Sequence, residues 1–246
     1  VLIATWLKCQ NWRISFLLSV LGSNLYLLLI TEILSLFSRL NLLFVSIAWA
    51  IPIFILGLNM LVPKLREQIY FPQIKLSKLT WHQITLIAMI TMILLILGVT
   101  AFFAPPNTSD VLNYHLPRVM HWIQNQSVRH YPTGIEFQNT YPPGAEYQIL
   151  HLAILAGSDR WVNFAAWFTL LASVVCVSLF AESLKLNLDG QLLSALFLVT
   201  LPGALLLAGT SKNDLQVAFW VLFILTFMMR YFYKSQTPLT LAAVFA

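Results

Sequence analysis

The chain has 246 residues, of which 59% are apolar, 13% aromatic and only 9% charged, and its mean hydropathy is +0.79. Soluble domains carry about 25% charged residues, so this composition excludes a cytosolic protein and indicates a polytopic membrane protein. The net charge of +5 does not indicate nucleic-acid binding, because the basic residues lie between apolar stretches, where they orient membrane proteins. Cys9 and Cys176 lie far apart in the sequence, so no disulfide framework or cysteine-based metal site is expected.

Several apolar stretches approach the roughly 20 residues that a membrane-spanning helix needs. They cover residues 14–36, 41–62, 84–103, 161–180, 192–208 and 215–233, and a further run begins at residue 239. We therefore expect an all-α integral membrane protein of about 6–7 transmembrane helices. The first residue is not Met and the last apolar run stops at residue 246, so we interpret the chain as a C-terminally truncated fragment.

Residues 145–157 form a separate short apolar segment that is typical of a helix at the membrane surface rather than a span. If this segment does not cross, nine basic residues fall on one side and five on the other, which predicts a cytoplasmic N-terminus. The nine are Lys8, Arg13, Lys64, Arg66, Lys75, Lys78, Lys185, Arg230 and Lys234, and the five are Arg39, Arg118, Arg129, Arg160 and Lys212.

This topology predicts one transmembrane domain over residues 1–246. Residues 1–83 would hold two spans and a basic cytoplasmic loop, and residues 84–234 would form a core with an extracytoplasmic loop at 104–160 that carries juxtamembrane helices. Such a protein would lie in a bacterial plasma membrane.

The first concentration of polar residues follows the third apolar stretch. Asp110, Tyr114 and Arg118 are spaced by four, so a helix would align them on one face, and Pro117 is tolerated in its first turn. His115 is less well aligned.

The second concentration is the polar segment 210–214, which contains Lys212 and Asp214 and lies on the same predicted side as Asp110. Two carboxylates at one membrane face can converge on a cleft between spans. The alternative is helix capping, for which Ser109, Asp110, Asn213 and Asp214 are all suitable.

The loop between residues 124 and 147 is rich in Tyr, His, Asn and Pro. Its aromatic and amide side chains suit polyhydroxyl ligands such as sugars, although interfacial aromatic residues also anchor membrane proteins. The histidines lack metal-ligand spacing, and no hydrolase elbow, phosphate loop or dinucleotide motif is present.

At these clusters the sequence resembles the GT-C superfamily of polytopic membrane glycosyltransferases. It is most similar to bacterial relatives of the protein O-mannosyltransferases and the lipid A aminoarabinose transferase, in a subgroup often found in cyanobacteria. The resemblance covers residues 84–234 and rests on three motifs, which are Ser109-Asp110-Val-Leu-Asn113-Tyr114, Tyr141-Pro-Pro-Gly-Ala-Glu-Tyr147 and Lys212-Asn213-Asp214. Here a single acid stands where the family has an acidic pair, and Asn113 stands where it has Arg.

The resemblance implies inverting transfer of a sugar from a polyprenyl-phosphate donor to a lipid, glycan or protein acceptor on the extracytoplasmic side. Asp110 would be the general base, and in relatives that use a metal a divalent cation would lie near Asp110 and Asp214. The residues expected to bind substrate are Tyr114, His115, Arg118, Tyr141, Glu146, Lys212 and Asp214. Membrane lipids would be further partners, and nucleic acid would not.

Two other classes of protein remain open at this point. A transporter or flippase of lipid-linked saccharides should place polar residues near the middle of the membrane, whereas here they gather at one edge. A structural membrane subunit whose loop binds a partner would tolerate the loss of the Asp110 carboxylate.

Overall fold

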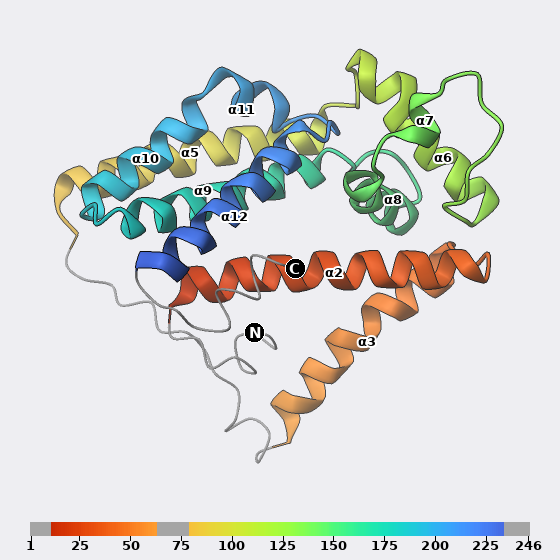
Figure 1. Ribbon diagram of the computed structural model, residues 1–246, viewed down its shortest axis with the longest axis horizontal. Helices are drawn as coiled ribbons and strands as arrows, with labels where there is room; N and C mark the ends of the chain where they lie inside the picture. Colours follow the sequence, from red (N-terminus) through yellow and green to blue (C-terminus); the bar gives the residue numbers. More distant parts are fainter. Residues whose placement is uncertain (1–10, 63–78, 234–246) are drawn as a thin grey trace.

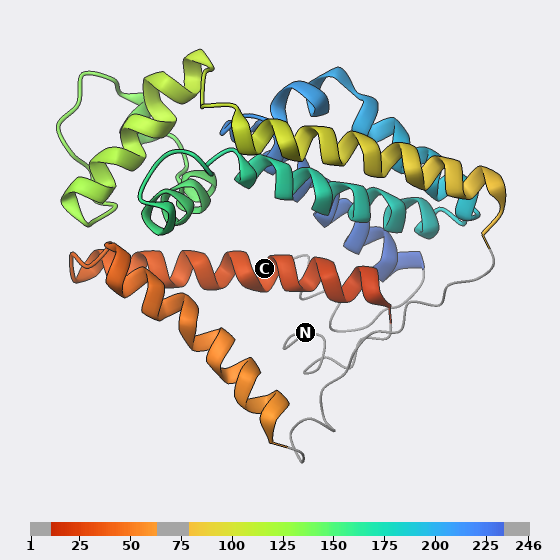
Figure 2. The ribbon, with the colours of Figure 1, turned by 180° about the vertical axis from the view of Figure 1, so that it is seen from behind.

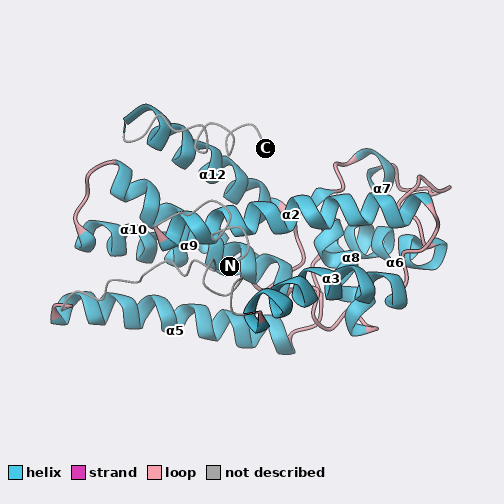
Figure 3. Cartoon of the chain, turned by 90° about the horizontal axis from the view of Figure 1, so that it is seen from below, coloured by secondary structure: helices cyan, strands magenta, loops and turns pink. Residues whose placement is uncertain are grey.

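The computed structural model describes residues 11–62 and 79–233, and all regular structure within these ranges is helical (Figure 3). The long helices are α2 (Trp12–Leu36), α3 (Leu42–Leu61), α5 (Trp81–Phe103), α9 (Phe164–Ser183) and α12 (Asp214–Tyr233). The shorter elements are the π-helical turn η1 (Val111–His115), α6 (Leu116–Asn125), α7 (Phe137–Thr140), α8 (Gly144–Ala156), α10 (Leu188–Thr200) and α11 (Pro202–Leu207).

The five long helices are each long and apolar enough to cross a membrane, which agrees with the expected all-α membrane fold. The expected span at residues 192–208 is instead two helices, α10 and α11, broken at Pro202. Proline has no backbone N–H and disfavours helical geometry in the preceding residue, and Leu201 is accordingly extended, with φ −60° and ψ 130°. The basic loop of Lys64, Arg66, Lys75 and Lys78 and the run from residue 239 lie outside the described residues.

Helix α9 is the centre of the fold, because it contacts α12, α10, α5, α2 and α8. Helix α2 runs along one side of this group, and α3 diverges from it (Figures 1 and 2). Within α3 only Val45 and Ala48 are buried, so much of this helix lies outside the packing of the described residues. At one end of the long helices Glu182 forms ion pairs with Arg13 at 3.3 Å and with Arg230 at 3.0 Å. These pairs join α9 to α2 and α12.

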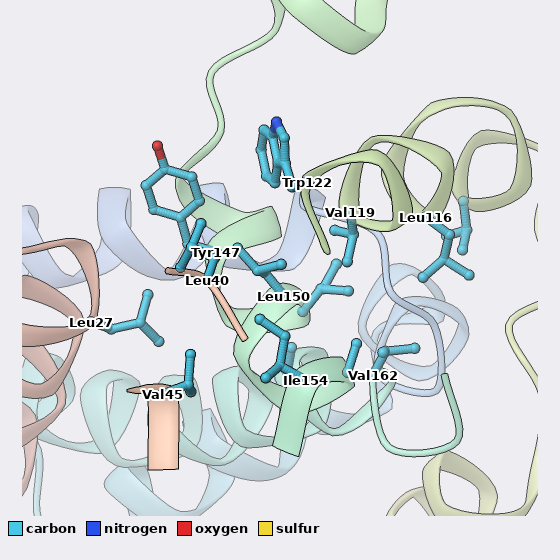
Figure 4. Packing of buried hydrophobic residues seen from close by; sticks show 14 of the residues in the cluster. Leu27, Leu40, Val45, Leu116, Val119, Trp122, Tyr147, Leu150, Ile154 and Val162 are labelled. Carbon is cyan, nitrogen blue, oxygen red and sulfur yellow. The ribbon is translucent and has the colours of Figure 1, made fainter. Parts of the chain in front are cut away.

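Helices α6, α7 and α8 lie together at the other end of the long helices (Figures 1 and 2). The apolar core beneath them has Leu150 and Ile154 of α8 near its centre, with Val119 of α6 and Val45 of α3 around them (Figure 4). Helix α8 has 13 residues and is too short for a span, as expected for residues 145–157. By packing on α2, α3, α6 and α9, it covers this end of the bundle and supports the polar residues above it.

Candidate functional site

The π-helical turn η1 sets the direction in which Asp110 and Arg118 point. The backbone N–H of Leu116 bonds to the carbonyl of Val111, five residues earlier, so the helix gains a residue relative to α-helical spacing. The expected alignment of Asp110, Tyr114 and Arg118 on one face is therefore wrong. The Asp110 side chain is 44% exposed whereas that of Arg118 is 3% exposed. Pro117 lies in the first turn of α6, as expected.

Lys212 brings the two predicted carboxylates together. Its Nζ lies 2.5 Å from Oδ2 of Asp110 and 3.8 Å from Oδ2 of Asp214, and all three side chains are partly exposed. The hydrogen bond to Asp110 raises the pKa of Lys212, so the ammonium group stays charged at neutral pH. Asp110 makes no side-chain capping hydrogen bond, so capping does not explain this residue. Asp214 lies in the first turn of α12, where the helix dipole favours an acid.

A buried asparagine fixes the segment that carries Lys212. Asn163 is fully buried, donates from Nδ2 to the carbonyl of Ala104 at 2.9 Å and accepts from the hydroxyl of Ser211 at 2.6 Å. These bonds join the end of α5, the start of α9 and the polar segment 210–214. The position of Lys212 is therefore set by the fold rather than by a flexible loop.

His115, Arg118 and Glu146 form a buried ionic cluster behind the exposed acids. Oε1 of Glu146 lies 2.9 Å from Nδ1 of His115 and 3.4 Å from Nη1 of Arg118, and Nη2 of Arg118 donates to the carbonyl of Tyr141 at 2.6 Å. The three side chains are at most 3% exposed. In the described part of the chain, Oε2 of Glu146 and Nε2 of His115 have no hydrogen-bond partner. These residues, expected to bind substrate, are enclosed and hold the loop in place.

Tyr114 lies between the exposed acids and the buried cluster. Its ring packs against that of His115, with centroids 4.1 Å apart, and edge-on against that of Tyr141 at 5.6 Å. Burial raises the pKa of Tyr114, and the negative charge of Asp110 raises it further. The phenol is therefore a neutral hydrogen-bond donor at physiological pH. Every residue expected in the site belongs to this connected region.

An apolar cavity of about 530 Å³ begins next to this region and runs between α2 and α12. Its wall includes Pro142 and Asn213, the neighbours of Tyr141 and Asp214. The rest of the wall is mostly apolar and includes Leu21, Leu25, Leu28, Val217, Trp220, Phe223 and Ile224. The polar cluster therefore lies next to an apolar space of the kind that holds a lipid chain.

Three amides cross this apolar space in one hydrogen-bonded row. Gln216 donates to Gln148 at 3.1 Å, Gln148 donates to Asn24 at 2.6 Å, and Asn24 donates to the carbonyl of Val20 at 2.9 Å. The same amides line a second cavity of about 420 Å³, which also contacts Trp49. The sequence analysis missed this row, and the only signal was isolated amides inside apolar stretches.

The arrangement does not fit a bound divalent cation. Among the described residues, no group of three or more His, Cys, Asp or Glu side chains could hold a metal ion. Asp110 and Asp214 supply two carboxylates, but the ammonium group of Lys212 lies between them. Since Mg²⁺ and Ca²⁺ need several oxygen ligands, this pair alone does not make such a site.

No known protein family, curated protein or solved structure matched the chain when it was compared with each.

Proposed function

We propose that this protein transfers a sugar from a polyprenyl-phosphate donor to an acceptor at the extracytoplasmic face of the membrane. The observation that carries the proposal is the meeting of Asp110 and Asp214 on Lys212 next to an apolar cavity. A substrate with a charged head and a long apolar chain needs both environments within one site. The charged groups around Lys212 supply the polar environment, and the cavity wall formed by α2 and α12 supplies the apolar one.

The chemistry requires one base and no separate acid. Asp110 takes the proton of an acceptor hydroxyl as that oxygen bonds to the anomeric carbon of the sugar. The bond between this carbon and the phosphate oxygen breaks, and its electron pair leaves on the polyprenyl phosphate. Attack from the face opposite the phosphate inverts the anomeric configuration. Lys212 stabilises the phosphate charge, and Asp214 holds Lys212 in place.

The cavity is long enough to hold the first part of the carrier chain. Its wall follows α12 from Asn213 to Ile224, which is about 16 Å at 1.5 Å per residue. The chain would enter beside Asn213 and pass the amide of Gln216. Membrane lipids occupy the same space when the carrier is absent.

A lipid-linked saccharide flippase is the second candidate. The row of amides formed by Asn24, Gln148 and Gln216 favours it, because polar side chains within spans often mark a transport path. A flippase moves its lipid without breaking the sugar–phosphate bond, so the release of polyprenyl phosphate separates the two functions.

The test uses the full chain in proteoliposomes with a set of short-chain polyprenyl-phosphate sugars. We expect Asp110→Asn to abolish the release of polyprenyl phosphate while the protein still binds the donor. The matched control is Glu136→Gln, an exposed carboxylate in the same loop, which should turn over normally. Turnover by Asp110→Asn at the wild-type rate would remove Asp110 as the base. Movement of the intact lipid across the bilayer without bond cleavage would favour the flippase.

A further inference from the structure

An aromatic surface, to which the proposed reaction gives no role, lies at the edge of the site. Phe137 of α7 is 49% exposed and Tyr141 is 40% exposed. Their rings are stacked, with centroids 5.0 Å apart and planes 29° apart. Large exposed aromatic side chains packed together beside charged groups are typical of a binding surface.

The surface is built rigidly although it lies in a loop. Gln138, which follows Phe137, is buried, accepts hydrogen bonds from the hydroxyls of Tyr131 and Thr133, both at 2.9 Å, and donates to the carbonyl of Asn113 at 2.9 Å. On the other ring, Arg118 fixes the backbone carbonyl of Tyr141. Both rings are therefore held before any ligand binds, which reduces the entropy cost of binding.

The spacing of the rings determines what they can take. A guest between two rings would separate their centroids by about 7–8 Å, twice a normal contact distance of 3.5–4.0 Å. The centroid distances among Tyr114, Phe137 and Tyr141 are 5.0 Å, 5.6 Å and 6.3 Å, so the rings fill this space themselves. This geometry excludes a cage for a methylated ammonium ion and leaves an outer surface on which a flat or chair-shaped ring can lie.

Polar groups lie along one side of this aromatic surface. Tyr114 is in edge contact with Phe137 and Tyr141, and the charges of Asp110 and Asp214 act on its phenol. An aromatic face that contacts C–H groups, together with carboxylates and phenols that bond hydroxyls, is complementary to a pyranose ring.

We propose that Phe137 and Tyr141 form a carbohydrate-stacking subsite that holds a pyranose ring next to Asp110. This inference rests on the proposed sugar transfer and adds the residues that recognise the sugar. The ring belongs to the donor or to a glycan acceptor, and the two sources share the same stacking chemistry.

The experiment measures saturation transfer from the protein to methyl pyranosides by NMR. The full chain is placed in phospholipid nanodiscs, because glycoside detergents would themselves fill the subsite. Methyl mannoside and methyl glucoside are the probes, and sorbitol, an acyclic polyol without a ring C–H face, is the comparison. We expect Phe137→Ala to weaken pyranoside binding about tenfold, as loss of a stacking aromatic does elsewhere, and Phe137→Trp to retain it.

The matched control is Phe103→Ala, which removes another exposed ring, 70% exposed, at the end of α5. Equal weakening in Phe137→Ala and Phe103→Ala would overturn the subsite, as would unchanged binding in Phe137→Ala. Loss of membrane insertion, rather than of pyranoside binding, in Phe137→Ala would show that the rings are membrane anchors. Pyranoside binding without turnover in the wild type would refute the transferase and keep the subsite.

A competition arm assigns the source of the ring. If a polyprenyl-phosphate sugar displaces the methyl pyranoside but the corresponding polyprenyl phosphate does not, the donor sugar occupies the subsite. If both leave the pyranoside bound, the subsite serves a glycan acceptor. Either result supports carbohydrate stacking. Displacement of the methyl pyranoside by polyprenyl phosphate, which carries no sugar, contradicts it.

Discussion

The ammonium group of Lys212 lies 2.5 Å from a carboxylate oxygen of Asp110, and this contact joins two parts of the chain that are far apart in sequence. Asp110 precedes the π-helical turn after α5, whereas Lys212 precedes α12. The second carboxylate, Asp214, is 3.8 Å from the same nitrogen. One cation therefore lies between two acids that would otherwise repel each other.

Lys212→Met should reduce sugar transfer by at least about tenfold while changing stability little. An exposed ion pair contributes only about 0–1 kcal/mol to folding, so unfolding temperature should hardly move. In the proposed reaction, activity depends instead on the placement of Asp110 and on a cation for the leaving phosphate. Single-turnover release of polyprenyl phosphate and thermal unfolding in nanodiscs measure the two effects. Arg129→Met, which removes an exposed cation from the same loop, is the control.

The second variant in this test is Lys212→Met with Asp214→Asn, which removes the repulsion but not the need for a cation. Its donor binding should exceed that of Lys212→Met, whereas turnover should stay low. Full activity in Lys212→Met would show that the ammonium group plays no part in the reaction.

Arg118→Met should destabilise the protein by about 3–5 kcal/mol, because it leaves the carboxylate of Glu146 buried without its guanidinium partner. Replacing both groups, as in Arg118→Met with Glu146→Leu, should restore most of the loss. Arg118→Lys should fail to rescue, since one ammonium group cannot reach both Glu146 and the carbonyl of Tyr141 as the planar guanidinium does. Thermal unfolding in nanodiscs measures each variant, and additive losses in the double variant would contradict a coupled pair.

Long apolar runs predicted most of the helices, because the bilayer demands about 20 such residues whatever the tertiary contacts are. Hydropathy did not reveal the break at Pro202, since the run from residue 192 to 208 stays apolar through it. It also did not reveal the π-helical turn, after which Leu116 and Arg118 are buried.

The polar residues of the site were found from the sequence because each is costly beside a membrane. Their division into an exposed group around Lys212 and a buried group around Glu146 was not, since burial depends on where α8 packs. Asn163 and Gln216 were missed for the same reason, because an isolated amide in an apolar stretch carries no mark of its hydrogen-bond partner.

Topology can be tested with single cysteines in a background without Cys9 and Cys176. Asn125→Cys and Asn213→Cys should be labelled by a membrane-impermeant thiol reagent from one side of the membrane. Leu186→Cys, in the exposed turn between α9 and α10, should be labelled from the other side. Labelling of Asn125→Cys and Asn213→Cys from opposite sides is incompatible with a single site at one membrane face.

Protonation of His151, in α8, should affect the stability of the protein. Trp49 donates from Nε1 to Nδ1 of His151 at 2.9 Å, so Nδ1 is unprotonated and Nε2 carries the proton that reaches Thr31 at 2.8 Å. The Thr31 hydroxyl in turn donates to the carbonyl of Leu27 at 2.7 Å. The neutral imidazole thus joins α8 to α2 and α3, and burial lowers the pKa of His151 to about 4.

Since the pKa of this histidine is about 4 in the folded protein and 6.5 in the unfolded chain, the unfolded state binds more protons between these values. The free energy of unfolding should therefore fall as the pH is lowered from about 6.5 to 4, by on the order of 3 kcal/mol at 1.36 kcal/mol per pH unit. His151→Gln keeps an acceptor for Trp49 and a donor for Thr31 but does not titrate, so its stability should fall less over this range. Thermal unfolding of both proteins at matched pH measures the difference, and parallel pH profiles would mean that His151 does not contribute.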